Sequence, residues 1–304
     1  MQEKIGNIVI NLNFYSGKDF YSDGDIEDEI LNIVKTNSEF MNILAKDIRW
    51  PILYHLSPQR RNLLEWYNFN KRCNLLEIGA GCGALTGLFC EKVDRVVAVE
   101  LSRRRAEIIA QRHKDKSNLE IIVGNFNDIK LDEKFDYITL IGVLEYAAQY
   151  TQSGKPHGDF LKKINNCLKP GGVVIIAIEN RFGLKYWAGA GEDHSGKIFD
   201  SLEDYIDTEG VVTFSKDELT KLLQDAGYTR VEFFYPVPDY KMPKQLFSDD
   251  KLPFSGELGL IGTCFPAYDK ERVTLFNEKL VYNNLIKNNK FDFFANSFLL
   301  FCRT

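Results

Sequence analysis

The chain has 304 residues, of which 44% are hydrophobic and 27% are charged, proportions typical of a globular protein with a sizeable core. Its 38 Lys and Arg against 43 Asp and Glu give a net charge of −5, which argues against a general nucleic-acid binder, because such proteins present a basic face to phosphates. The six cysteines form no CxxC pair, and the sequence shows neither an apolar run of membrane-spanning length nor a secretory signal. We therefore expect reduced thiols, no membrane span and a cytoplasmic location.

Residues 1–70 are predicted to form an N-terminal strand and a helical cap. Apolar residues alternate with polar ones at the start, which indicates a strand, and apolar residues at helical spacing follow the turn and N-cap chemistry of Ser22–Asp25. Trp50-Pro51 is expected to break the chain, and Ser57-Pro58 indicates a new helix start. The predicted elements are a strand over 5–14 and helices over about 26–34, 38–46 and 57–67.

From Asn74 onward, short apolar runs alternate with helical stretches, a pattern that predicts βαβ units around a parallel sheet. The predicted strands are 74–79, 95–100, 119–124, 135–142 and 171–179, and the predicted helices are 84–92, 102–114 and 158–168. The alternation then stalls in a glycine-rich stretch after Glu179. Later elements are a helix over 216–226 capped by Ser215, a strand over 230–235, a helix over about 271–287 and a terminal strand over 293–302. The fold class is therefore α/β, with residues 71–304 as a doubly wound core and insertions at about 180–212 and 236–290.

A glycine loop directly follows the first predicted core strand. Its three glycines, Gly79, Gly81 and Gly83, have the spacing GxGxG rather than the GxGxxG of a dinucleotide site. Glu77 precedes the loop, where a pyrophosphate would gain nothing from negative charge, and Glu100 ends the next strand, where a carboxylate can accept both hydroxyls of a ribose. The predicted ligand has a ribose, a cationic amino-acid part and no phosphate.

S-adenosylmethionine fits this description, and the sequence resembles the class I S-adenosylmethionine-dependent methyltransferases, closely over residues 72–180 and more loosely over 213–235 and 293–303. The resemblance implies a mostly parallel, seven-stranded Rossmann-like sheet with S-adenosylmethionine as cofactor. It also implies that the methionine, ribose and adenine are contacted by Glu77, Gly79, Ala80, Gly81, Cys82, Gly83, Glu100, Leu101, Asn125 and Phe126, and that Gly142 and Val143 border the sulfonium. The family usually has Asp at the position of Asn125, whose amide oxygen can still accept a hydrogen bond from adenine. A Rossmann-like domain that has lost its ligand is the alternative.

The stretches LLEIGAGCGALT and VVAVELSRR resemble ribosomal RNA adenine dimethyltransferases. Those enzymes carry Asn-Leu-Pro-Tyr or a near variant at the end of the fourth strand, whereas this chain has Ile141-Gly142-Val143-Leu144-Glu145-Tyr146. The absence of that motif and the negative net charge both argue against an RNA acceptor. A non-catalytic, methyltransferase-like partner protein is a third possibility, against which the intact glycine loop argues.

The acceptor is predicted to be a polar small molecule or a glycan, methylated at a hydroxyl group. The segment after Glu179 starts at the carboxyl edge of the sheet, where open α/β sheets bind ligands, and it combines aromatic residues with Glu192, Asp193 and His194. A hydroxyl acceptor needs a base within hydrogen-bond reach, for which His194 and Glu145 are the candidates. The candidate substrate residues are Tyr146, Tyr186, Trp187, Asp193, Asp239 and Tyr240. The whole pattern resembles methyltransferases found beside or fused to glycosyltransferases in bacterial surface-polysaccharide loci, which implies glycan biosynthesis and a glycosyltransferase as partner or fused domain.

Other polar residues have structural interpretations. His55 is expected to be a packed or capping histidine, Tyr54 and Arg60 are candidates for closing over the donor carboxylate, and Arg103–Arg105 are expected to form a solvated helix face. The four histidines, at positions 55, 113, 157 and 194, form no ligand-spaced pair, so no metal site is predicted.

Overall fold

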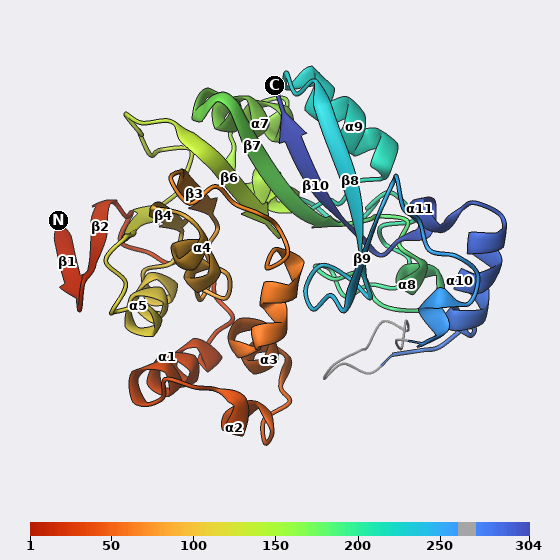
Figure 1. Cartoon of the computed structure of the whole chain (residues 1–304), viewed down its shortest axis with the longest axis horizontal. Helices are drawn as coiled ribbons and strands as arrows, with labels where there is room; N and C mark the ends of the chain where they lie inside the picture. Colours follow the sequence, from red (N-terminus) through yellow and green to blue (C-terminus); the bar gives the residue numbers. More distant parts are fainter. Residues whose placement is uncertain (261–271) are drawn as a thin grey trace. The chain divides into compact units, whose positions relative to one another are not determined.

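The computed structural model describes residues 1–260 and 272–304, which divide into two compact units. Unit 1 comprises Met1–Leu140 and Asn166–Val173, and unit 2 comprises Ile141–Asn165 and Val174–Thr304. Figure 1 shows the elements of both units. Residues 261–271, which include Cys264 and part of the second predicted insertion, lie outside the described residues. Among the helices of the described ranges, none has the length and apolar character needed to cross a membrane.

Unit 1 is built on a largely parallel sheet in the order β1-β2-β5-β4-β3-β6. From β2 to β6 all neighbours run parallel, and β1 pairs antiparallel with β2. The central strands are buried on both faces, because helices cover a doubly wound sheet on both sides. The strands are β1 (Gln2–Ile5), β2 (Ile8–Phe14), β3 (Asn74–Ile78), β4 (Arg95–Glu100), β5 (Leu119–Gly124) and β6 (Phe135–Ile141).

The helices of unit 1 pack around the loop that follows β3. Helix α1 lies against α5 (Figure 1), and a buried cluster joins Ile30, Ile52 and Ile108 to Cys82 of the glycine loop. The front section therefore supports the loop rather than standing apart from it. The helices are α1 (Ile26–Thr36), α2 (Met41–Leu44), α3 (Trp50–Leu56), the 3₁₀ helix η1 (Pro58–Leu63), α4 (Thr86–Lys92) and α5 (Arg103–Arg112).

The front section differs from its prediction in four places. Trp50-Pro51 opens helix α3 instead of breaking the chain, because proline is tolerated in a first helical turn, where its missing N–H is not needed. The strand predicted over 5–14 is two strands joined by a turn at Gly6, whose φ is +58° and whose Cβ would lie 2.4 Å from the Lys114 carbonyl oxygen. The helices predicted over 38–46 and 57–67 shrink to α2 and η1.

Unit 2 has an antiparallel sheet in the order β7-β10-β8-β9. Its strands are β7 (Leu168–Glu179), whose first residues belong to unit 1, β8 (Arg230–Val237), β9 (Gln245–Ser248) and β10 (Ser297–Arg303). Its helices are η2 (Leu144–Tyr146), α6 (Ala147–Tyr150), α7 (Pro156–Asn166), α8 (Leu184–Trp187), α9 (Lys216–Asp225), η3 (Glu257–Leu260), α10 (Glu278–Lys287) and α11 (Phe291–Phe294). The start of the predicted terminal strand is the helical turn α11, which buries Phe291 against Tyr235, Phe247 and Tyr282.

The predicted α/β class is confirmed, and the predicted cap of α9 is present as a capping box between Ser215 and Glu218. The described residues form ten strands rather than the expected seven. Strands β1 and β2 of the front section and β9 of the proline-rich stretch account for the difference: β2 pairs with β5 and β9 with β8, the two edge strands of the predicted seven, and β1 pairs with β2.

Candidate functional site

The glycine loop after β3 turns back on the end of β4. Gly79, Gly81 and Gly83 have φ values of +72°, +56° and +75°, a region that side-chain-bearing residues rarely adopt. The backbone N–H groups of Gly79 and Ala80 both donate to the carbonyl oxygen of Val99, at 2.9 and 3.2 Å. Glycine is therefore required at these three alternate positions by the positive φ values of the loop backbone.

Two buried carboxylates flank this loop. Glu100 accepts hydrogen bonds from the backbone N–H of Gly81 at 2.7 Å and of Ser102 at 3.0 Å, so it ties the loop to the start of α5. Glu77 accepts from the hydroxyl of Thr86 at 2.7 Å, and burial raises the pKa of Glu77 to about 8. Within the described residues neither carboxylate forms an ion pair with a cationic side chain, so both suit a ligand that brings positive charge or hydroxyl groups.

The other predicted donor residues of unit 1 lie along the same edge of the sheet. Asn125 directly follows β5, and its side-chain oxygen accepts from the backbone N–H of Asn127 at 3.0 Å, which fixes the turn. Phe126 is buried beside it, and Leu101 is partly buried after β4. These residues all follow the carboxyl ends of parallel strands, which is where such sheets place their ligands.

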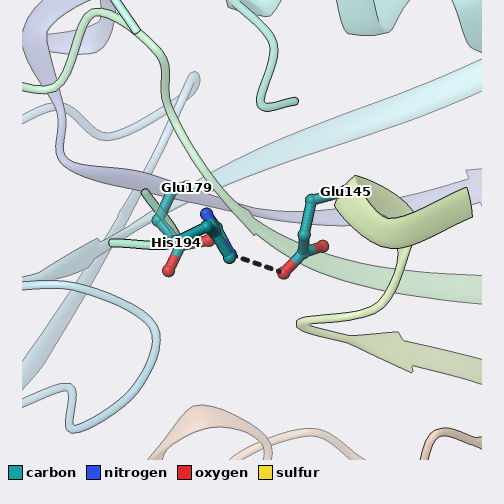
Figure 2. A group of neighbouring side chains, drawn as sticks. All are labelled: Glu145, Glu179 and His194. Atoms are coloured by element: carbon teal, nitrogen blue, oxygen red, sulfur yellow. Dashed lines mark ion pairs between the residues drawn. The ribbon is translucent and has the colours of Figure 1, made fainter. Parts of the chain in front are cut away.

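Unit 2 contains a second group of buried acids, here called the carboxylate–histidine cluster and defined as Glu145, Glu179, Glu192 and His194. Glu145 lies in η2 directly after β6, Glu179 ends β7, and the other two lie in the loop after α8. The side chains of Glu145, Glu179 and His194 point toward one another (Figure 2). The three glutamates are at most 1% exposed, whereas the side chain of His194 is 11% exposed, so the imidazole is the member of the cluster that solvent reaches.

His194 is fixed between two of these carboxylates. Its Nδ1 lies 2.9 Å from Oε1 of Glu192, whose other oxygen accepts from the backbone N–H of His194 and of Ser195, each at 2.7 Å. Its Nε2 faces Oε1 of Glu145 across 3.6 Å (Figure 2). Burial lowers the pKa of His194, but the facing carboxylates outweigh it and raise that pKa well above its ordinary value, while burial raises the pKa of Glu145.

Two buried lysines lie next to the cluster. Lys185 donates to Asp193 at 2.5 Å, and Lys241 donates to the other oxygen of Asp193 at 3.0 Å and also contacts Glu179. The hydroxyl of Tyr186 donates to Asp193 at 2.6 Å. Burial opposes ionisation of Asp193, yet the two lysines lower its pKa well below the ordinary value. Asp193 is therefore an ionised link between two ammonium groups.

Comparison with known proteins identifies the family. A profile described as "Methyltransferase domain" matches residues 50–232, more than half of the chain. The chain belongs to this methyltransferase family. The class I, S-adenosylmethionine-dependent assignment made from the glycine loop is thereby confirmed, and so is the predicted cofactor of the family.

Individual relatives share only part of this methyltransferase. A cypemycin N-terminal methyltransferase of a Streptomyces species is 29% identical over 102 residues, which are 34% of this chain and 40% of that protein. Ribosomal RNA small subunit methyltransferase A of Mycoplasma mycoides is 39% identical over 71 residues, which are 22% of this chain and 26% of that protein. The chain thus spans less than half the length of either curated relative.

A solved structure agrees on the fold. The complex between the Haloferax volcanii Trm112 methyltransferase activator and a methyltransferase has a TM-score of 0.50 to this chain at 19% identity. The match covers 87% of this chain and 95% of that one. At this identity the likeness establishes the fold alone.

The residues of this methyltransferase that were predicted to contact the acceptor differ in their burial and in their neighbours. The ring of Tyr146 packs edge-on against His194 at a centroid distance of 5.2 Å. Tyr240 is buried, and a Cβ on Gly142 would lie 2.8 Å from its hydroxyl, so Gly142 allows a close approach there. Asp239 is buried within 4.0 Å of both lysines, whereas Trp187 is 43% exposed and packs against Phe294 instead.

Sequence reasoning assigned no role to three residues of this region: Glu179, Lys185 and Lys241. Glu179 carries the signal that identified Glu100, since each is an acid at the last position of a buried strand. The two lysines carry no such signal, because a buried lysine is recognisable only once its acidic partners are known. The prediction of no metal site rested on local histidine spacing, which is blind to the grouping of Glu145, Glu179 and His194 from three separate segments.

The predicted solvated face of α5 is wrong for one of its arginines. Arg103 is exposed and Arg104 is half-buried, but Arg105 is buried, with its Nε donating to Glu27 at 2.7 Å and its guanidinium paired with Asp23 at 2.7 Å. Asp23 also lies 2.9 Å from Nε2 of His55, which is a packed histidine in agreement with its structural interpretation. These contacts hold α1 and α3 against α5.

Proposed function

We propose that this protein transfers the methyl group of S-adenosylmethionine to a hydroxyl group of a polar small molecule or glycan. Unit 1 binds the donor through the glycine loop, Glu77 and Glu100, and the carboxylate–histidine cluster of unit 2 receives the acceptor hydroxyl. The observation that carries the proposal is the imidazole of His194, which is 11% exposed and has a carboxylate facing each ring nitrogen.

The chemistry explains why a hydroxyl acceptor calls for such a cluster. The acceptor oxygen attacks the methyl carbon, a C–O bond forms, the S–C bond breaks and S-adenosylhomocysteine leaves as a neutral thioether. The hydroxyl proton must also leave, and a positioned group that accommodates it accelerates the step. His194 and Glu145 are the groups we assign to this activation, and orientation of the acceptor supplies much of the remaining acceleration.

The surrounding side chains suit an acceptor rich in hydroxyl groups. Tyr146 offers an aromatic face beside His194, and Asp239 offers an oxygen without a hydrogen-bond partner in the described residues, whereas the Tyr186 hydroxyl and both oxygens of Asp193 are already engaged. The glycosyltransferase partner, the link to glycan biosynthesis and the cytoplasmic location remain predictions of the sequence.

A radiolabel-transfer assay tests the proposal. Purified protein with methyl-labelled S-adenosylmethionine is offered sugar nucleotides and other polyhydroxy compounds, primary amines, and ribosomal RNA in parallel. Label in an ether product is the expected result. Label only in amines or RNA, or binding of the donor without turnover on any class, would contradict a hydroxyl acceptor and favour the N-methyltransferase or non-catalytic alternative.

Substituting Glu100 with alanine should weaken binding of S-adenosylhomocysteine by about 1–3 kcal/mol, or about 5- to 150-fold in Kd, because buried ribose hydroxyls lose a charge-assisted partner and the Gly81 N–H loses its acceptor. Isothermal titration calorimetry measures the change. Asp94→Ala, at the exposed opposite end of β4, is the matched control and should bind normally. Equal affinity in both variants would remove Glu100 from the donor site.

The raised pKa of Glu77 predicts that donor affinity depends on pH. Below a pKa of about 8 the free protein holds Glu77 protonated, so the cationic amino-acid part of the donor binds only after that proton is lost. The Kd for S-adenosylhomocysteine should therefore fall by up to about tenfold per pH unit between pH 6 and pH 8. Titrations at several pH values check this, and Glu77→Gln should flatten the profile. A flat profile in the unsubstituted protein would contradict a direct role for Glu77.

A further inference from the structure

Three residues of the carboxylate–histidine cluster each bring one potential donor atom close to those of the other two. The donor atoms of Glu145, Glu179 and His194 all lie within 4.8 Å of one another, although the residues come from η2, the end of β7 and the loop after α8 (Figure 2). Oε2 of Glu145 and Oε2 of Glu179 have no hydrogen-bond partner among the described residues, yet the two side chains are 1% and 0% exposed. Buried carboxylate oxygens without partners are costly, which indicates that something binds them.

The setting of His194 is that of a metal ligand. One ring nitrogen is held by Glu192, whose own second oxygen is fixed by two backbone N–H groups, and the other nitrogen faces the cluster. Histidines that bind metals characteristically give their second ring N–H to a carboxylate in this way. The gap of 3.6 Å between Nε2 and Glu145 Oε1 is too long for a hydrogen bond. It is close to the separation of about 3.0–3.5 Å expected of two donors that share one ion.

The charges in this region also call for a cation. Five carboxylates meet two ammonium groups and one imidazole: Glu145, Glu179, Glu192, Asp193 and Asp239 against Lys185, Lys241 and His194. The two lysines contact Asp193 and Glu179 and approach Asp239, so the five carboxylates exceed the two ammonium groups by three negative charges. A divalent cation between Glu145 and Glu179 would offset two of these charges and would also give a partner to the Oε2 atoms that have no hydrogen bond.

We propose that Glu145, Glu179 and His194 bind a divalent transition-metal ion of the Mn²⁺ or Zn²⁺ kind. An imidazole with two carboxylates suits these ions better than Mg²⁺ or Ca²⁺, which prefer all-oxygen ligand sets. Three protein ligands leave coordination positions open for an acceptor oxygen, as in catalytic rather than structural metal sites.

This inference rests on the proposed function and specifies how the cluster activates the hydroxyl. The acceptor hydroxyl binds the ion at an open position, which lowers the pKa of the hydroxyl, and its proton passes to solvent water. The oxygen then attacks the methyl carbon, so that the C–O bond forms as the S–C bond breaks. Glu192 is a positioning residue here, because it acts only through His194.

Metal binding is tested directly on the full chain after treatment with EDTA and removal of the chelator. Titration with Mn²⁺, followed by loss of the free-ion electron paramagnetic resonance signal, should give one tight site per chain, and Zn²⁺ should compete for it. Glu179→Gln and Glu145→Gln should each weaken Mn²⁺ binding at least tenfold, and Glu192→Gln should weaken it about 10- to 100-fold. Glu203→Gln, an exposed acid of the same unit, is the matched control and should leave binding unchanged.

The readouts separate this inference from the proposed function. Circular dichroism and S-adenosylhomocysteine affinity report on the fold of every variant. Failure of Mn²⁺ and Zn²⁺ to bind, or full hydroxyl methylation by the metal-free protein, would overturn the metal site and leave the methyltransferase proposal standing. Tight binding that is lost in the glutamine variants, without methylation of any hydroxyl compound, would support the site and overturn the proposed acceptor. Tight binding that persists in folded Glu145→Gln and Glu179→Gln would place the ion elsewhere and overturn the assignment.

Discussion

Replacing His194 with alanine should reduce the rate of methyl transfer to the hydroxyl acceptor by about 10²- to 10⁴-fold, the usual contribution of a positioned proton-transfer group. The imidazole touches the reacting hydroxyl in our proposal, whether directly or through a bound ion, and its removal leaves Glu145 and Glu192 facing a void. The donor residues of unit 1 do not include His194, so the Kd for S-adenosylhomocysteine should stay unchanged. Steady-state kinetics with saturating donor, combined with calorimetry, measures both quantities.

Lys197→Ala provides the control for this loop. Lys197 lies three residues further on and is exposed. Its ammonium donates to the carbonyl of Asp207 and the hydroxyl of Thr208, and its backbone bonds to the loop survive the substitution, so loss of the side chain should change turnover little. A parallel loss of donor affinity in His194→Ala would mean that the loop is structural rather than catalytic. Unchanged turnover in that variant would remove His194 from the reaction.

Arg105→Leu should lower the free energy of unfolding by about 3–5 kcal/mol, because removing one partner of a buried ion pair leaves the other charge uncompensated. Glu27 is fully buried and would lose the cationic group that pairs with it, keeping only the neutral donors Ser22 Oγ and the Asp23 backbone N–H. Asp23 would keep its contact with His55 but lose its pairing with Arg105. Leucine keeps the apolar stem of the arginine and isolates the loss of charge. Urea unfolding followed by circular dichroism gives the change.

Arg103→Leu is the matched control for this comparison. Arg103 belongs to the same first turn of α5 and also pairs with an acid, Glu3, at 2.6 Å, but its side chain is 52% exposed. Exposed ion pairs contribute little, so this variant should change stability by less than about 1 kcal/mol. Equal effects of the two substitutions would show that burial of Arg105 has no energetic consequence.

The central sheet could be predicted closely because its strands are buried on both faces. β4 and β5 begin and end where the apolar runs predicted them, since continuous Val and Ile runs bounded by charge or glycine leave little alternative. Helix α3 was missed because proline was interpreted as a breaker, although its fixed φ fits a first turn. β9 was missed because its four residues carry too short a pattern.

The two halves of the candidate site also differed in how far the sequence could predict them. The donor loop and Glu77 form one contiguous motif, whereas Glu145, Glu179 and His194 are separated by 34 and 15 positions and meet only through tertiary structure. The burial of Arg105 was available from helical periodicity, because Ile108, Ile109 and Arg112 follow it at helical spacing on the inward face of α5. The charge of the three arginines suggested a solvated face, but the position of Arg105 on the helix places it on the buried side.

The central place of β10 in its sheet has a consequence for biosynthesis. β10 lies between β7 and β8. The backbone N–H and C=O groups of these two strands that face β10 therefore have no strand partner until residues 297–303 have been translated. All residues of unit 1 have left the ribosome well before that moment, because its last segment ends at Val173. We therefore expect nascent chains to carry an early folded half and a late, aggregation-prone half, and premature termination upstream of β10 to yield insoluble rather than partly active product.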